Sequence, residues 1–141
     1  MALLNMFASK STEEAKAKPG GSAALDLKQA LEIHHLLNEK LQKVLEGNND
    51  DDLEVEVISQ DHICMIGKWL YGEGKDLYAH LPEYESMRKV HAELHTCAGE
   101  VLSAHQNGNT NYADALFKTK FRTTANKNRM EFTQLFRAAN R

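Results

Sequence analysis

The stretch MRKVHAELHTCAGEV, residues 87–101, decides the fold class of this chain. Its apolar residues recur at intervals of three and four, which is the spacing of one face of an α-helix. They are Met87, Val90, Leu94, Ala98 and Val101. Pro82 is well placed for a first helical turn and Gly108 for a stop, so we predict a helix from residue 82 to about residue 105. His91 and His95 are four residues apart and therefore share one face of this helix.

Two further long helices are predicted by the same periodicity. The first covers residues 23–46, with Asp26 in its first turn and Gly47 as its stop signal. Its expected inward stripe consists of Leu27, Leu31, His34, Leu37, Leu41 and Val44. The last helix covers residues 111–139. Its expected inward face consists of Phe117, Phe121, Thr124, Phe132 and Leu135.

The region between the first two long helices has a weaker pattern. Residues 48–52 are predicted to form a polar loop, since they lack the ligand spacing of a calcium site. Residues 53–58 alternate weakly and indicate a short extended stretch. Ser59 is expected to be the N-cap of a short helix over residues 60–71, which Gly72 and Gly74 end. The prediction is an all-α fold, a four-helix bundle with three long helices and one short one.

Composition and charge limit the classes of function. The chain has 141 residues, 42% of them hydrophobic, and a net charge of −3. One domain with a real core is therefore expected, and a nucleic-acid-binding surface is not. No apolar stretch approaches the ~20 residues of a membrane span, and the N-terminus lacks the pattern of a secretory signal. Residues 1–22 are predicted to be a flexible tail, because they end in the breaker cluster Pro-Gly-Gly-Ser, and residues 23–141 to be the domain.

Helical position sorts the seven histidines. His34 shares its face with leucines and is expected to point into the core, whereas its neighbour His35 shares a face with polar residues. His91 and His95 flank Leu94 and are expected to face the interior. His62 is expected beside the short helix, where it can support a ligand. His80 and His105 are expected at the surface.

Cys64 adds a sulfur donor to this inward set. A single buried histidine is most often a hydrogen-bonded core residue, and a single buried cysteine an inert packing residue. Three imidazoles and one thiol in one core would leave several polar atoms unpaired unless a cation binds them. The same four groups complete the tetrahedral shell of a zinc ion, and a closed shell is typical of a structural or sensory site. The short helix is thus the expected metal-ligand-bearing one, and a cysteine bound to metal favours a reducing, cytoplasmic location.

Three residues around these donors have expected structural roles. Gly67 would let another backbone approach the short helix closely, at a cost in helix propensity. Trp69, the only tryptophan, is expected to be a packing anchor. Cys97 lies two residues past His95, so it points to a different side of its helix and is expected to be a small packing residue.

The assembled motifs resemble the chemoreceptor zinc-binding (CZB) domain of bacterial sensory proteins. The resemblance rests on His34 with Leu37, on the block CMIGKW at residues 64–69, and on His91-x-x-x-His95, and it extends over residues 25–137. One departure is Leu37, which stands where the family often has tryptophan.

The resemblance implies one zinc ion per chain, held by His34, Cys64, His91 and His95. It also implies a sensory or regulatory role in bacterial signal transduction, in chemotaxis or cyclic-di-GMP systems. The signal would be zinc itself, or an oxidant such as hypochlorous acid acting on the zinc-bound cysteine. Family members usually carry a chemoreceptor signalling region or a diguanylate cyclase, for which this chain has no room. A stand-alone member or an excised fragment is expected, with such signalling proteins or a second copy of the chain as partners.

Other functions stay open from the residues alone. A hemerythrin-like di-iron site would use His35 and Glu39 together with the pair on the long helix, but these two lie on the polar side of their helix. A plain interaction module would use the metal only as a staple in a dimer. An enzyme is not expected, because the sequence contains no nucleophile elbow, phosphate loop or paired inward carboxylates.

Overall fold

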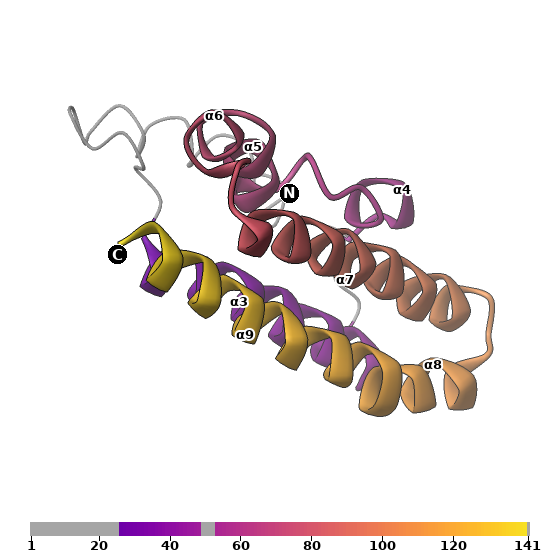
Figure 1. Ribbon diagram of the computed structural model, residues 1–141. Helices are drawn as coiled ribbons and strands as arrows, with labels where there is room; N and C mark the ends of the chain where they lie inside the picture. The colour runs from indigo at the N-terminus through magenta and orange to yellow at the C-terminus, as the bar shows by residue number, and fades with distance from the viewer. Residues whose placement is uncertain (1–25, 49–52, 141) are drawn as a thin grey trace.

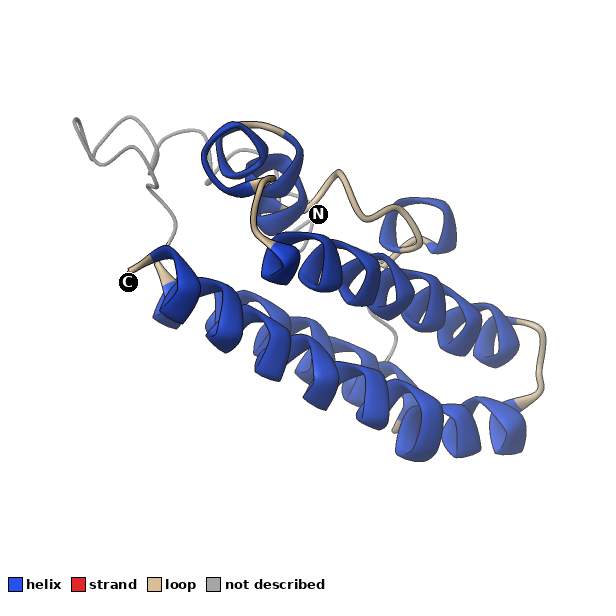
Figure 2. Cartoon of the chain, viewed as in Figure 1, coloured by secondary structure: helices blue, strands red, loops and turns tan. Residues whose placement is uncertain are grey.

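The computed structural model describes residues 26–48 and 53–140. Every regular element in these two ranges is helical, which confirms the all-α fold class (Figure 2). The predicted tail at residues 1–22 and most of the predicted polar loop, residues 49–52, lie outside the described residues. None of the described helices combines the length and the apolar character needed to cross a membrane.

Three long helical rods form the body of the fold (Figure 1). The first is α3 (Leu27–Leu45) and the second is α7 (Pro82–Gln106), close to the predicted bounds. The third consists of α8 (Thr110–Leu116), a π-helical segment η1 (Phe117–Phe121) and α9 (Arg122–Ala139). α7 packs against α8 and α9, while α3 packs against α9, so the third rod touches both of the others.

The third rod has the predicted inward face but is not a regular α-helix throughout. All five residues expected to face inward are buried. Within the π-helical segment the rings of Phe117 and Phe121 stack with centroids 5.4 Å apart, and Thr119 donates a hydrogen bond to the carbonyl of Ala115. A π turn inserts one extra residue and rotates the faces of the helix beyond it, which periodicity alone does not reveal.

The start of α3 corrects the predicted helix boundary. Asp26 has an extended backbone, so the helix begins after it rather than at residue 23. Asp26 is the N-cap: its carboxylate accepts from the Gln29 N–H at 2.7 Å, and the Gln29 side chain accepts from the Asp26 N–H at 3.2 Å. This capping box satisfies two amides that a helix start leaves without partners. At the other end, Gly47 has a positive φ of 96° and stops the helix as predicted.

The buried face of α3 is rotated from the predicted stripe. Leu37, Leu41 and Val44 are buried as expected, but the N-terminal half buries Ala30 and Ile33 instead of the leucines beside them. The predicted members that are only half-buried as whole residues are Leu27, Leu31 and His34, although the Nε2 atom of His34 is buried. Val90 on α7 is half-buried too, whereas the rest of its predicted stripe is buried.

The region between α3 and α7 differs most from the prediction. It holds three short helices, α4 (Val55–Ile58), α5 (Met65–Tyr71) and α6 (Glu73–Tyr78), rather than an extended stretch and one helix. The prediction of an extended stretch over residues 53–58 is wrong. No described segment offers this stretch a strand to pair with, so its backbone groups form local hydrogen bonds and α4 packs on α7.

Two predicted boundaries in this region are also wrong. Ser59 is the C-cap of α4 rather than the N-cap of the next helix, and α5 begins six residues later, after Cys64. Gly72 ends α5 as expected, but Gly74 lies buried inside α6, where a Cβ would meet the Trp69 ring at 2.8 Å. Trp69 is the packing anchor expected: its ring lies 5.9 Å from that of Phe136, so it joins the short helices to α9.

Candidate metal centre

The four donors predicted from the sequence converge at one point. His34 comes from the middle of α3, Cys64 from the residue before α5, and His91 and His95 from α7. One potential ligand atom from each lies within 4.8 Å of all the others. In the described ranges this is the group of histidine, cysteine and acidic residues able to hold a metal ion.

The separations of the sulfur from two of the imidazoles match the sulfur–nitrogen edge of a zinc tetrahedron. The Cys64 Sγ atom lies 3.4 Å from Nε2 of His91 and 3.5 Å from Nε2 of His95. Zinc bonds of about 2.0–2.1 Å to nitrogen and about 2.3 Å to sulfur, at the tetrahedral angle, place nitrogen and sulfur about 3.5 Å apart. In addition, His34 Nε2 is buried with no hydrogen-bond partner among the described residues. The four residues therefore fit a tetrahedral zinc ion.

Gly67 allows Cys64 to reach this point. A Cβ on Gly67 would lie 1.7 Å from the carbonyl oxygen of Asp61, so only glycine lets the start of α5 cross the preceding turn this closely. The Gly67 N–H also donates to Cys64 Sγ at 3.3 Å. The close approach predicted at this glycine is thus confirmed, and it aims the sulfur at α7.

Gly99 likewise allows a close approach of two backbone segments, in this case one that positions His95. Nothing in the sequence distinguishes this glycine. A Cβ there would lie 1.9 Å from the Ser59 hydroxyl oxygen, so α4 packs directly on the backbone of α7. That packing brings the Ile58 carbonyl within 2.9 Å of His95 Nδ1. Nδ1–H donates to this carbonyl, which leaves the Nε2 lone pair directed at Cys64.

His34 is held differently, by a side chain on the third rod. Its Nδ1 atom lies 2.7 Å from the amide nitrogen of Asn128 on α9. Asn128 is only 2% exposed and lies four residues after Thr124 and four before Phe132 on the inward face of α9. The signal that could have found it is a lone amide on an otherwise apolar helical stripe.

Burial sets the protonation of the cluster. Desolvation lowers the pKa of His34 and His91 well below 6.5, with neighbouring histidines adding to it, and also lowers that of His95. Desolvation raises the pKa of the Cys64 thiol to about 12, against the lowering effect of the backbone N–H groups of Gly67 and Ile66. At neutral pH the imidazoles are ready to bind a cation, whereas the thiol ionises only if a cation is present.

A family comparison identifies this arrangement. The model of the chemoreceptor zinc-binding domain, CZB, matches residues 21–102, more than half of the chain. The chain belongs to the CZB family. Searches of the curated proteins and of the solved structures gave no match. The CZB match covers all four donors and ends within α7, short of the residue 137 expected from the motifs, so Asn128 and the third rod lie beyond it.

The remaining candidates lie outside the CZB donor cluster. His35 and Glu39 are 66% and 52% exposed and face each other at 3.8 Å, so they cannot supply a buried di-iron site with the α7 pair. His62 and His80 are exposed, while His105 is half-buried rather than at the surface as predicted. Cys97 is buried but is not part of the cluster.

Proposed function

We propose that this chain is a zinc-binding sensory domain of bacterial signal transduction, in which His34, Cys64, His91 and His95 hold one zinc ion. The observation that carries the proposal is the convergence of these four side chains within 4.8 Å, with the sulfur at the edge length of a zinc tetrahedron from two of the imidazoles. CZB membership supports it independently, because the family is defined by zinc binding. The short helices α4, α5 and α6 then take the place of the fourth helix of a bundle, with Cys64 as their link to the long helices.

Bound zinc would supply the positive charge that keeps Cys64 as a thiolate at neutral pH. The thiolate is the nucleophilic form of cysteine. Hypochlorous acid would oxidise it by two electrons: the sulfur takes the oxygen and its proton to become sulfenic acid, and chloride leaves. A sulfenic acid is a weaker ligand than a thiolate. Oxidation at Cys64 would therefore weaken the connection of α5 to α3 and α7, as loss of zinc would.

The output of such a change would pass to a signalling partner. We propose a cytoplasmic regulatory role in a chemotaxis or cyclic-di-GMP system, with a chemoreceptor or diguanylate cyclase as partner and no enzymatic activity of its own. A homodimer is part of the proposal. The regulatory role is supported by the position of α5, which depends on Cys64 and on the tight crossing at Gly67, so a change at the metal would move this helix.

Metal analysis of the purified protein tests the proposal. We expect one zinc per chain in the parent protein and in Cys97→Ala, which removes the buried thiol outside the cluster. In Cys64→Ala we expect zinc to be lost during dialysis against a mild chelator. Zinc retention that is equal in both variants would refute the ligand set.

Three tests then separate the sensor from the alternatives. Hypochlorous acid should release zinc from the parent protein and raise hydrogen exchange in α5; if it does neither, the oxidant signal is wrong. Zinc removal should leave a folded but altered helical domain, whereas complete unfolding would favour a zinc staple in a dimerisation module. A di-iron protein would be coloured in air, and a zinc protein is colourless.

A further inference from the structure

The hydrogen bond between Asn128 and His34 controls which nitrogen of the imidazole carries the proton. A neutral imidazole has one N–H, so the partner of Nδ1 decides the state of Nε2. If the Asn128 amide N–H donates to Nδ1, then Nε2 is protonated and cannot bind a cation. If the amide oxygen accepts from Nδ1–H, then Nε2 offers its lone pair to the cluster. The planar amide occupies the same space in both orientations.

The unpaired atoms around this contact show that the two orientations are coupled to the metal. With the amide nitrogen on Nδ1, both Asn128 Oδ1 and His34 Nε2 are buried without a hydrogen-bond partner in the described ranges. A buried N–H at Nε2 would face the other donors with nothing to accept it, which is costly. When the amide turns, the imidazole changes tautomer: Nε2 gives up its proton to solvent, Nδ1 takes one up and donates it to Asn128 Oδ1, and Nε2 is left as the fourth ligand of the tetrahedron.

We propose that Asn128 is the positioning residue for His34, and that its amide turns to accept from His34 Nδ1–H when the cluster binds a cation. The inference rests on the proposed zinc site and adds a residue outside the CZB match. His95 already has the equivalent arrangement through the Ile58 carbonyl. His34 reaches the same state through a side chain that can change its role from donor to acceptor.

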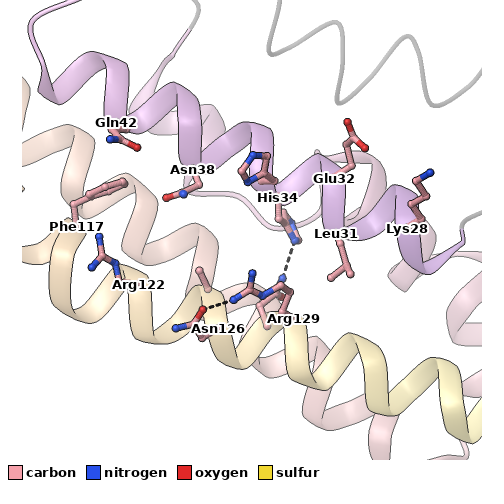
Figure 3. A pocket seen from close by; sticks show the side chains of 13 residues that line it. Lys28, Leu31, Glu32, His34, Asn38, Gln42, Phe117, Arg122, Asn126 and Arg129 are labelled. Atoms are coloured by element: carbon pink, nitrogen blue, oxygen red, sulfur yellow. Dashed lines mark hydrogen bonds between the residues drawn. The ribbon is translucent and has the colours of Figure 1, made fainter.

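This assignment also gives the third rod a part in the response. Figure 3 shows His34 extending from α3 toward α9, with a dashed line marking its hydrogen bond across the space between them. A surface groove lies along the same side, lined by His34 together with residues that include Lys28, Glu32 and Arg129. Cation binding would strengthen the contact between α3 and α9, and the central part of α9 would report metal occupancy.

Zinc affinity of three variants, measured by chelator competition, tests the assignment. Asn128→Leu removes both hydrogen-bonding roles, and we expect affinity to fall about 10–100-fold, as for other residues that orient metal-bound histidines. Asn128→Asp supplies only an acceptor, and we expect affinity within threefold of the parent or tighter. The matched control is Asn126→Leu on the same helix, whose exposed amide bonds Arg129 rather than a donor of the cluster; it should leave affinity unchanged.

Further readouts separate a positioning role from a structural one. The metal-free Asn128→Leu protein should be folded and unfold at a urea concentration close to the parent's, because the change removes the unpaired Asn128 Oδ1 but leaves His34 Nδ1 without its partner. Zinc should slow hydrogen exchange around residue 128 in the parent and in Asn128→Asp, but not in Asn128→Leu. Equal affinity in Asn128→Leu, or an equal loss in Asn128→Leu and Asn128→Asp, would overturn the inference. A parent protein that binds no zinc would instead refute the proposed function.

Discussion

The two sides of the donor cluster are held in place by different kinds of contact. The inner side consists of Cys64, His91 and His95, each at most 1% exposed, and close backbone packing at Gly67 and Gly99 positions the first and the last of them. The outer side consists of His34, which is half-buried beside a groove and held by the side chain of Asn128. Backbone packing cannot adjust without moving a helix, whereas an amide turns about one bond. We therefore expect the inner side to keep its geometry without metal and the outer side to respond.

Removing one ligand from each side in turn should give the largest change in zinc affinity, and the change should differ between the two sides. Structural zinc sites bind with about 10–16 kcal/mol, so loss of one of four donors should weaken zinc binding by roughly a hundredfold to a thousandfold. We expect the loss of zinc affinity in His91→Ala to be at the upper end of this range, because the ring is fully buried and water cannot easily take its place. His34→Ala should lose about tenfold less, since the groove lets water take the open position.

Chelator competition measures both affinities. His35→Ala, one residue along α3 and exposed, is the control and should bind zinc like the parent. If His34→Ala costs as much as His91→Ala, the outer side is no more adaptable than the inner one.

Replacement of Gly67 tests the backbone packing of the inner side. A Cβ 1.7 Å from the Asp61 carbonyl forces α5 away from the preceding turn, so Gly67→Ala should lower the free energy of unfolding by about 3 kcal/mol. Zinc affinity should fall with it, because the displacement carries Cys64 away. Lys68→Ala, at the exposed neighbouring position, should change urea unfolding by no more than about 0.5 kcal/mol. Unfolding of Gly67→Ala at the parent's urea concentration would show that this crossing does not constrain the sulfur.

Acid and base should destabilise the metal-free protein for separate reasons. The pKa values of His34 and His91 lie below the ordinary 6.5, so below that pH the unfolded chain binds more protons and stability falls. The slope is at most about 1.4 kcal/mol per pH unit for each imidazole. The pKa of Cys64 is raised from 9.0 to about 12, so above pH 9 the unfolded chain loses its proton first and stability falls again.

Urea unfolding of the metal-free protein from pH 5 to pH 10 checks this dependence. Stability should be greatest between about pH 6.5 and pH 9, the ordinary values of the two groups. His91→Phe should flatten the acid limb. A parent profile without an acid limb would mean that the imidazoles are not buried in the metal-free state.

The smallest expected effect on stability and zinc affinity comes from a change outside the donor cluster, at the start of α3. Asp26→Ala removes the acceptor for the Gln29 N–H and should cost about 1 kcal/mol of folding free energy. Zinc affinity should stay within about threefold, because His34 lies two turns further along the helix. Asp26→Asn, which keeps an acceptor, is the control for the unfolding measurement. A large loss of zinc in Asp26→Ala would show that helix fraying reaches the cluster.

The sequence predicted the long helices and the shared face of the two α7 histidines, for physical reasons. α3 and α7 are amphipathic over several turns, so their periodicity outweighs local ambiguity, and His91 and His95 follow from spacing on one helix. The prediction for residues 53–58 failed because Val55 and Val57 favour extended backbone, while tertiary packing on α7 overrides that preference.

The supporting residues were not predictable in the same way. Asn128 bonds a histidine 94 residues away, and Gly99 matters only because Ser59 packs on it. Such contacts depend on how the rods are placed in space, which helical periodicity does not determine. A polar residue on an apolar stripe marks a place to look and does not name its partner.

X-ray absorption of the zinc-loaded protein tests the central claim most directly, because it counts the atoms bound to the metal. The account predicts one sulfur at about 2.3 Å and three nitrogens at about 2.0–2.1 Å, with the sulfur contribution absent in Cys64→Ala. A zinc shell without sulfur in the parent protein, or one dominated by oxygen, would contradict it.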